Sequence, residues 1–382
     1  MADNADFNAG KVPLPLLVAD GRAPNEKIIA LNTTIFEFNP WELGSFDNTL
    51  RGFVPLRFLG SNFTGGVLPQ NKQCVRGFDN FGFIIGTSSS LFNQFILQLD
   101  TVSGIPDFVR SAITSVLNRI GNKNNDIASY TPNPFLGWNN ASNLGAGSHM
   151  LTLVDGGEDL QNIPYHPLIQ TKRKVDVIFS LDSSADTPSG WPNGASIVAT
   201  YERSTNLSIA NGTSFPSIPD NRTFINLGLN DRPTFFGCNS SNTTVQSPLI
   251  VYIPYHPYEY LANISTFSLG VNNSERNAII RNGYDVVTMA NATRDKEWPV
   301  CVGCAILHRS FERTKTNIPD SCKQCFQRYC WDGKVNATVP APYVPAVFNQ
   351  LISVRSAASS IEGSTLMSAM IVASVAAFVT LI

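Results

Sequence analysis

The sequence predicts an α/β fold, and two observations support this prediction. Three runs of strand length, residues 153–155, 175–179 and 249–253, consist mainly of β-branched and other apolar residues. Two further stretches, residues 91–99 and 106–120, carry apolar residues at the spacing of a helix. Because 27 glycines and 24 prolines are spread along the chain, we expect the fold to be rich in loops.

Composition limits the classes of function. The 382 residues are enough for one large domain or two smaller ones. Lys and Arg total 27 and Asp and Glu total 29, which gives a formal net charge of -2. This balance provides no basic surface for a nucleic acid, so no nucleic-acid partner is expected.

The N-terminal third is predicted to contain short strands followed by helices. Residues 1–75 are expected to form loops and short strands, with apolar runs at 28–31 and 34–38. A turn is expected over residues 82–86, with residues 88–90, three serines, as the N-cap of the helix at 91–99. After the helix at 106–120, residues 121–148 are predicted to form a polar loop.

The middle of the chain contains the first candidate catalytic residue. Residues 153–159 read Leu-Val-Asp-Gly-Gly-Glu-Asp, and the apolar strand at 175–179 follows a polar, proline-bounded stretch. A strand that ends in an acid before a Gly-Gly turn commonly holds a catalytic carboxylate at the carboxyl edge of an α/β sheet. Asp155 could therefore serve as a general base if burial raises its pKa. The alternative is a tight turn that Asp155 caps with its own side chain.

A Ser-His-Asp triad is not indicated. No serine lies in a Gly-x-Ser-x-Gly turn, and the nearest sequence, Gly86-Thr87-Ser88, lacks the second glycine. His149 precedes Asp155 by six residues and could line the same site. A loop histidine without a catalytic role is the favoured interpretation.

Cysteine usage indicates an oxidising compartment. The seven cysteines are Cys74, Cys238, Cys301, Cys304, Cys322, Cys325 and Cys330. The two Cys-x-x-Cys sequences match the spacing of a zinc ribbon as well as a disulfide-rich block. Because glycosylation sequons at Asn291 and Asn336 flank the block, we favour disulfides and expect no metal or other cofactor. The pairing cannot be deduced from the sequence.

Glycosylation sequons are unusually frequent, which also indicates passage through the secretory pathway. The twelve sites are Asn32, Asn62, Asn140, Asn206, Asn211, Asn221, Asn239, Asn242, Asn263, Asn272, Asn291 and Asn336. Because five of them fall between residues 206 and 242, we expect that stretch to be exposed.

The C-terminus has the pattern of a glycolipid-anchor signal. Residues 365–382 are uncharged and apolar, and small polar residues precede them. A transmembrane helix is the alternative, but such a helix is usually followed by Lys or Arg. We therefore expect a spacer at 341–364, attachment of a glycosylphosphatidylinositol (GPI) anchor near residues 356–360, and a location at the cell surface or cell wall.

The N-terminus is expected to be incomplete. Residues 1–6 have neither the basic segment nor the apolar segment of a signal peptide, although the sequons and the anchor signal require secretion. The odd cysteine count agrees with a partner cysteine upstream.

The region around Asp155 resembles fungal lysophospholipase/phospholipase B, whose catalytic domain is related to cytosolic phospholipase A2. The resembling blocks are residues 153–159, 162–164, 166–169, 175–179 and 182–185, with further blocks at 18–24, 36–42, 77–80 and 86–93. The likeness covers about residues 12–335. It implies that residues 1–340 form the C-terminal portion of a patatin-related α/β hydrolase domain with a disulfide-rich C-terminal block.

The resemblance implies hydrolysis of a carboxylic ester by a Ser-Asp dyad. In the family, a serine in a Gly-x-Ser-Gly-Gly turn attacks the fatty-acyl ester of a lysophospholipid or diacyl phospholipid, and water then releases the fatty acid. An upstream arginine holds the phosphate, and glycine amides form the oxyanion hole. Asp155 matches the dyad aspartate, whereas the serine and the arginine match nothing in this sequence. The alternative is an inactive or truncated, GPI-anchored, glycosylated surface protein.

Overall fold

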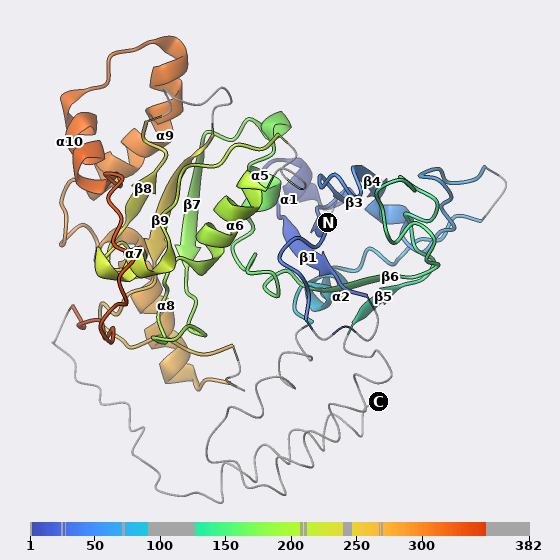
Figure 1. The fold of residues 1–382 in the computed structure, drawn as a ribbon, viewed down its shortest axis with the longest axis horizontal. Coiled ribbons are helices and arrows are strands. Elements are labelled where there is room, and N and C mark those ends of the chain that lie inside the picture. The colour runs from blue at the N-terminus through green and yellow to red at the C-terminus, as the bar shows by residue number, and fades with distance from the viewer. Residues whose placement is uncertain are drawn as a thin grey trace, which may run out of the picture.

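The computed structural model describes residues 2–23, 26, 28–70, 73–90, 127–206, 209, 212–239, 247–266, 268 and 270–348. Within these residues the chain forms two β-sheets, and helices cover both faces of the second sheet (Figure 1). The predicted α/β fold is therefore confirmed. The helices predicted at 91–99 and 106–120 and the apolar tail at 365–382 lie outside the described residues.

The first sheet contains six strands in the order β4-β3-β2-β1-β6-β5, and every neighbouring pair is antiparallel. The strands are β1 (Leu17–Gly21), β2 (Ile35–Phe38), β3 (Glu42–Ser45), β4 (Gly52–Pro55), β5 (Ala128–Tyr130) and β6 (Leu151–Asp155). Strands β1 to β4 follow one another as a meander, in which three residues join β2 to β3 and six join β3 to β4. Strand β6 comes much later in the sequence and pairs with β1.

Helix α2 (Phe81–Thr87) packs beside β1 and β6 over one face of the first sheet. Its Ile84 is buried in a core of aliphatic and aromatic side chains from the strands. At the end of the helix, the hydroxyl oxygens of Thr87 and Tyr130 lie 2.6 Å apart and share a hydrogen bond. The same core is extended by the 3-10 helix η1 (Leu56–Phe58), while the short helix α1 (Ala5–Asn8) packs Phe7 against Trp41.

The second sheet has three strands in the order β7-β9-β8, namely β7 (Val177–Asp182), β9 (Leu249–Pro254) and β8 (Thr234–Phe236). Strand β7 is parallel to β9, and β8 is antiparallel to it. All six residues of β9 are buried. A central strand covered on both faces needs no polar alternation, which explains its unbroken apolar run. The strands predicted at 175–179 and 249–253 are thus confirmed, with β7 beginning at Val177.

Helices cover both faces of the second sheet and make it a three-layer structure. One face carries α5 (Tyr165–Leu168), α6 (Ala195–Thr205) and α7 (Asn221–Asn226), and the other carries α8 (Asn273–Thr288), α9 (Trp298–Thr314) and α10 (Asp320–Tyr329). Gly194 precedes α6 with a φ of 75°, and a Cβ there would lie 2.7 Å from the Phe224 ring. Glycine therefore lets α6 begin in close contact with α7.

Helices α9 and α10 form a hairpin joined by two disulfides, Cys301–Cys325 and Cys304–Cys322. The three-residue spacing places both cysteines of each helix on one face, so antiparallel helices pair them in nested order. A third disulfide joins Cys238 to Cys330, and Cys74 is an exposed free thiol. The disulfide prediction is confirmed for these six cysteines. Their sulfur atoms are bonded in pairs and are therefore not available as zinc ligands.

Some local predictions for the first 148 residues are wrong. Residues 28–31 do not form a strand; Ile29 is instead buried from a loop against Val154. Residues 82–86 belong to α2 rather than to a turn, because Asn80 Oδ1 accepts the Phe83 N–H at 3.2 Å and caps that helix. Ser88 therefore closes α2, and β5 interrupts the loop predicted at 121–148.

The stretch between residues 206 and 242 is less exposed than predicted. Asn206 and Asn239 are exposed, but Phe215, Ile218 and Phe224 are buried against the second sheet. The sequons at Asn211 and Asn242 lie outside the described residues. A high density of sequons therefore does not mean that the whole segment is exposed, because apolar residues between the sequons are buried.

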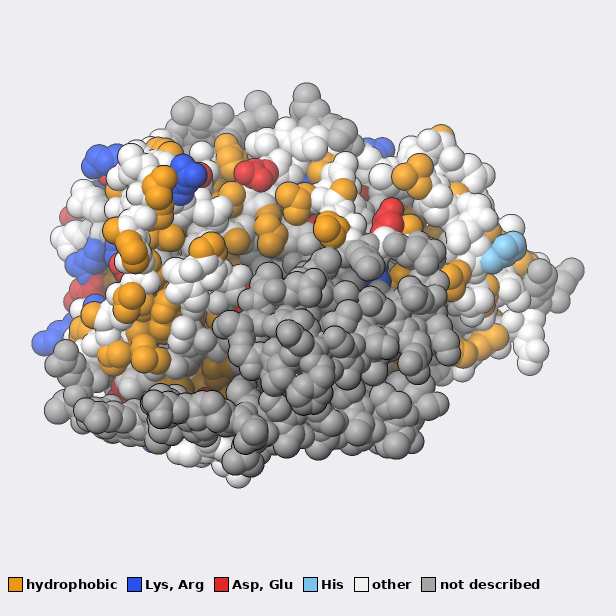
Figure 2. Space-filling view, turned by 60° about the horizontal axis from the view of Figure 1, so that its bottom comes forward, with side chains coloured by type: hydrophobic (Ala, Val, Ile, Leu, Met, Phe, Trp, Pro, Cys, Tyr) orange, Lys and Arg blue, Asp and Glu red, His pale blue; other side chains and the backbone are white. Residues whose placement is uncertain are grey.

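Exposed apolar side chains are spread over the surface. Phe81, Phe83 and Ile85 of α2 and Ile280 and Tyr284 of α8 are between 41% and 64% exposed. On the face shown in Figure 2, hydrophobic side chains lie among few charged ones, in agreement with the charged fraction of 15%. Among the helices of the described residues, none combines the length and the apolar character needed to cross a membrane.

Candidate active site

Asp155 is the last residue of β6 and lies beside Ala19 of β1. Its side-chain Oδ1 accepts the Gly157 N–H at 2.6 Å, and its own N–H donates to the Ser90 carbonyl at 3.3 Å. The strand predicted to deliver this acid is confirmed, but its sheet is antiparallel and β7 belongs to the other sheet. Asp155 therefore ends a strand of an antiparallel sheet, and not one at the carboxyl edge of a parallel sheet.

Burial gives Asp155 the character of a proton acceptor. It raises the pKa of the carboxyl group above its ordinary value, and the hydrogen bond from Gly157 opposes this change. A carboxylate with a raised pKa takes up a proton more readily. The self-capped turn named as the alternative is also present, but it uses only Oδ1; among the described residues Oδ2 receives no hydrogen bond.

Two glycines bring the turn after Asp155 close to β1. A Cβ on Gly156 would lie 2.7 Å from Val18 Cγ2 and 3.2 Å from the Val18 backbone, and a Cβ on Gly157 would lie 3.0 Å from Asp155 Oδ1. The Gln161 N–H closes the turn by donating to the Gly156 carbonyl at 2.9 Å. A side chain at either glycine position would displace the carboxylate or the turn.

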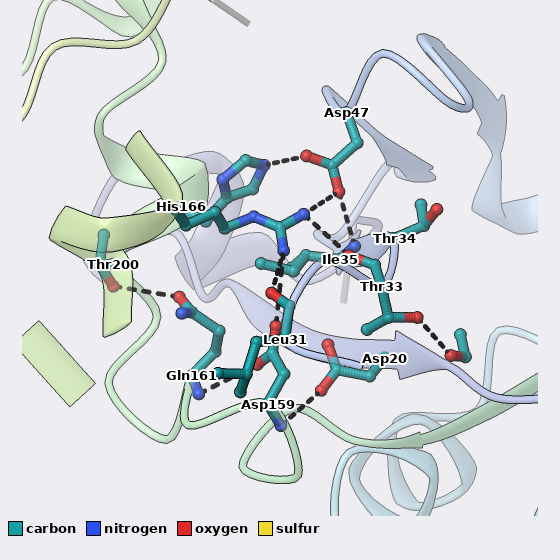
Figure 3. Close-up of polar contacts among 12 residues, drawn as sticks. Asp20, Leu31, Thr33, Thr34, Ile35, Asp47, Asp159, Gln161, His166 and Thr200 are labelled. Atoms are coloured by element: carbon teal, nitrogen blue, oxygen red, sulfur yellow. Dashed lines mark hydrogen bonds and ion pairs between the residues drawn. The ribbon is translucent and has the colours of Figure 1, made fainter. Parts of the chain in front are cut away.

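The far end of the turn enters a buried cluster of charged residues (Figure 3). The Asp159 N–H donates to Asp20 Oδ2 at 3.2 Å, and Asp159 Oδ2 lies 3.7 Å from Nη1 of Arg203 on α6. Arg203 Nη2 lies 2.6 Å from Asp47 Oδ2 and also donates to the Thr33 carbonyl at 2.8 Å. This cluster connects the first sheet to the helices of the second.

His166 of α5 completes the cluster. Its Nε2 lies 3.3 Å from Asp47 Oδ1. Burial lowers the pKa of His166 to about 4 despite the opposing charge of Asp47. The imidazole is therefore neutral at neutral pH and serves as a buried polar contact between the two sheets.

The two aspartates of the cluster, Asp20 and Asp159, both have raised pKa values. Burial raises the pKa of Asp20 well above its ordinary value, and the neighbouring Asp159 raises it further. Burial also raises the pKa of Asp159 to about 7, although Arg203 opposes this change. Beside the pair, the buried side chains of Arg22 and Glu158 lie 3.9 Å apart.

A cavity of about 280 Å³ borders the cluster on the α6 side. It is lined by Asp159, Arg203 and Glu202, by apolar side chains including Leu31, and by the sequon residues Asn32 and Asn206. Polar and charged walls of this kind suit water better than an acyl chain. We therefore assign no substrate to this cavity.

The remaining predicted site residues do not join Asp155. His149 is exposed, and its backbone carbonyl accepts the Asn133 N–H at 2.8 Å. Among the described residues, no histidine forms a hydrogen bond or an ion pair with Asp155. Of the ten described sequon asparagines, eight are exposed, and Asn221 and Asn336 are partly buried.

Sequence reasoning missed Asp20, Asp47 and Arg203. They lie far apart in the sequence, and no spacing rule connects them. Asp20 stands inside an apolar strand sequence, Leu-Val-Ala-Asp-Gly, and a charged residue within a buried strand is the one signal that could have drawn attention to it.

Comparisons with known proteins agree with the resemblance. A family model described as the lysophospholipase catalytic domain matches residues 1–336. A lysophospholipase of Arthroderma benhamiae is 58% identical over 383 residues, covering 100% of this chain and 59% of that protein. Lysophospholipase 1 of Aspergillus fumigatus is 61% identical over 340 residues, covering 89% of this chain and 54% of that protein.

Two further comparisons complete these findings. A lysophospholipase of Penicillium chrysogenum is 59% identical over 349 residues, covering 91% of this chain and 57% of that protein. The solved structure of human GIVD cytosolic phospholipase A2 aligns with a TM-score of 0.44 and 19% identity, over 64% of this chain and 35% of that chain. The chain thus spans between 54% and 59% of the length of these three curated relatives.

Proposed function

Because this chain belongs to the family of the lysophospholipase catalytic domain, we propose that the protein hydrolyses fatty-acyl esters of lysophospholipids with Asp155 as its general base. The observation that carries this proposal is the setting of Asp155. The carboxyl group ends a strand in a tight Gly-Gly turn, burial raises its pKa, and Oδ2 is left without a hydrogen bond in the described part of the chain.

The proposed reaction divides ester hydrolysis into two steps. In the first step, Asp155 takes the proton of a serine hydroxyl while the serine oxygen attacks the acyl carbonyl; the proton then passes to the departing glycerophospho alcohol. In the second step, Asp155 takes a proton from water as the water oxygen attacks the acyl-enzyme, and it returns that proton to the serine oxygen as the fatty acid departs. Diacyl phospholipids would react in the same way and form a second substrate class.

We propose that a Gly-x-Ser-Gly-Gly turn supplies the nucleophilic serine. This turn would belong to a segment equivalent to the part of the relatives that this chain does not match. The sequence itself contains no Gly-x-Ser-x-Gly. Asp155 is therefore proposed as one half of a Ser-Asp dyad, and a test of its role must supply the other half.

A fusion protein tests both statements. The unmatched part of the Penicillium chrysogenum relative is joined to this chain, and fatty-acid release from lysophosphatidylcholine is measured. We expect hydrolysis, and we expect Asp155→Asn to lower kcat by roughly 10² to 10⁴, the range typical of a lost general base. Asp186→Asn, which removes another carboxyl group of this chain, is the matched control and should retain activity.

Two results would contradict the proposal. Hydrolysis by Asp155→Asn at the rate of the unchanged fusion would remove Asp155 from the dyad. A folded fusion that binds lipid but releases no fatty acid would instead favour a non-enzymatic, glycosylated surface protein.

We also propose that the protein is glycosylated and held at the cell surface by a GPI anchor attached near residues 356–360. The exposure of eight sequon asparagines and the three disulfides support secretion. Residues 349–382 lie outside the described residues, so the anchor proposal rests on their composition. Release of the protein from cells by a phosphatidylinositol-specific phospholipase C is the expected result; retention after that treatment would contradict it.

A further inference from the structure

Asp20 lies next to the turn that carries Asp155, but on the opposite face of the sheet. In the β1–β6 register, Ala19 faces Asp155 and Asp20 faces Val154. Successive side chains of a strand point to opposite faces, so the Asp20 and Asp155 carboxyl groups leave the sheet on different sides. The turn connects the two sides, because the Asp159 N–H at its far end donates to Asp20 Oδ2.

The contact between Asp20 and Asp159 requires a proton. Both residues are at most 1% exposed, and the Asp159 N–H donates to Asp20 Oδ2, so the two carboxyl groups share one buried site. Two ionised carboxylates in one buried site repel each other, so one of them keeps a proton. Asp20 Oδ1 and Asp159 Oδ2 are both buried, and among the described residues neither has a hydrogen-bond partner. One shared proton would satisfy both oxygens.

The charges around the pair place this proton on Asp20. Arg203 lies 3.7 Å from Asp159 and therefore favours its ionised form, and Asp159 also accepts the Gln161 N–H at 3.1 Å. The stronger contact of Arg203, however, is with Asp47 at 2.6 Å. The charged or titratable residues that face the pair from neighbouring elements are Arg203 from α6, Asp47 from the β3–β4 loop, His166 from α5, and the Arg22–Glu158 ion pair.

We propose that Asp20 is a positioning residue for Asp155: its protonated carboxyl donates a hydrogen bond to Asp159 and so holds the turn from Asp155 to Asp159 in one conformation. Asp20 lies on the face of the sheet opposite Asp155 and acts only through the turn. The importance of that turn for catalysis rests on the proposed function. The protonation of Asp20 and the restraint that Asp20 places on the turn do not.

The pH dependence of unfolding tests the proton. Folded Asp20 keeps its proton at pH values where the unfolded chain, with an ordinary pKa of 3.8, has lost it. Folding then takes up a proton, so the wild type loses stability as the pH rises, tenfold per pH unit in the unfolding constant for one proton. Asp20→Asn keeps a donor and an acceptor but binds no proton.

We therefore expect the ratio of the wild-type to the Asp20→Asn unfolding constant to rise with pH above the unfolded pKa, by up to tenfold per pH unit, measured by urea unfolding between pH 5 and pH 7. Taking this ratio cancels the contributions of the groups whose pKa the substitution leaves unchanged. The matched control is Asp186→Asn. Hydrogen bonds from Ser265 and Thr266 lower the pKa of Asp186, so the corresponding ratio should stay constant over this range.

Amide hydrogen exchange tests the hold on the turn. The Gly157 N–H donates to Asp155 itself. The variant Asp20→Leu has no polar group at position 20. In this variant we expect the Gly157 amide to exchange at least tenfold faster at pH 5 than in the wild type. In Asp20→Asn it should stay within about threefold of the wild-type rate. The Val251 amide in the buried strand β9 serves as the reference for global unfolding, against which the Gly157 rates are normalised.

Each measurement can overturn the proposal. A wild-type to Asp20→Asn ratio that does not change with pH would show that Asp20 carries no proton. Equal Gly157 exchange in Asp20→Leu and the wild type would show that Asp20 does not hold the turn. If Asp20→Leu fails to fold, the Asp20→Asn series still decides the first point, and Gly157 exchange in Asp159→Leu decides the second. Neither readout depends on catalysis, so failure of the proposed function is distinguishable from failure of this inference.

Discussion

At the scale of single residues, the setting of Asp155 depends on how closely its turn approaches β1. The Gly156 Cα faces the Val18 side chain and backbone with no room for a Cβ. The Gly157 amide then reaches Asp155 Oδ1 at 2.6 Å. Small residues at both positions are thus a geometric requirement of the turn and not a sign of flexibility.

We predict that Gly156→Ala destabilises the protein by about 1–3 kcal/mol, because the added methyl group must displace Val18 or the turn. The free energy of unfolding in urea measures this change. Gly147→Ala is the control, since a Cβ at Gly147 would meet nothing within 4 Å. Equal stability of the two variants would mean that the turn accommodates the methyl group without strain.

At the scale of elements, the disulfides have unequal importance. Cys304–Cys322 lies inside Cys301–Cys325, with sequence separations of 18 and 24, so the two bonds restrict nearly the same loop. Cys238–Cys330 spans 92 residues and joins the segment after β8 to the end of the helical hairpin. In the chain-entropy model, a longer loop gives a larger stabilisation.

We predict that the double variant Cys238→Ala/Cys330→Ala loses roughly 4–5 kcal/mol of stability, the loop-closure value for 92 residues. The double variant Cys301→Ala/Cys325→Ala should lose well under half of that, because Cys304–Cys322 still closes most of the same loop. Urea unfolding of both variants under non-reducing conditions gives the comparison. A larger loss for the nested pair would contradict the entropic explanation.

At the scale of the whole molecule, a buried charged cluster joins the two sheets. Arg203 projects from α6 to Asp47 and Asp159, and Arg173 of the 3-10 helix η2 (Thr171–Arg173) forms a second ion pair with Glu37 of β2. Asp47 also accepts the Ile35 N–H at 2.8 Å, so the cluster is bonded to the backbone of the first sheet. The position of the Asp155 turn relative to the second sheet depends on these contacts.

We predict that Arg203→Met destabilises the protein by about 3–5 kcal/mol, because it leaves buried carboxylates without their cation. The control is Arg313→Met, which removes an exposed ion pair with Asp176 and should cost much less because water screens that pair. Thermal and urea unfolding measure both variants. Similar losses for the two arginines would show that the buried cluster does not hold the sheets together.

The sequence by itself determined the fold class, the family, the central strands and the candidate acid. Apolar runs such as that of β9 predict strands because burial on both faces leaves a continuous hydrophobic pattern. Asp155 could be named because its neighbours in the sequence, an apolar strand and two glycines, form the turn that holds it. The two Cys-x-x-Cys sequences, flanked by glycosylation sequons, predicted disulfides, but their pairing could not be deduced.

Tertiary structure alone decided the sheet pairing, the disulfide partners and the buried cluster around Asp20. Strand β6 pairs with β1 across most of the first half of the chain, and no local pattern specifies such a partner. Asp20, Asp47, Asp159 and Arg203 come from four separate segments. Whether a carboxyl group keeps its proton depends on burial and on charges brought near it by folding, and local sequence contains neither quantity.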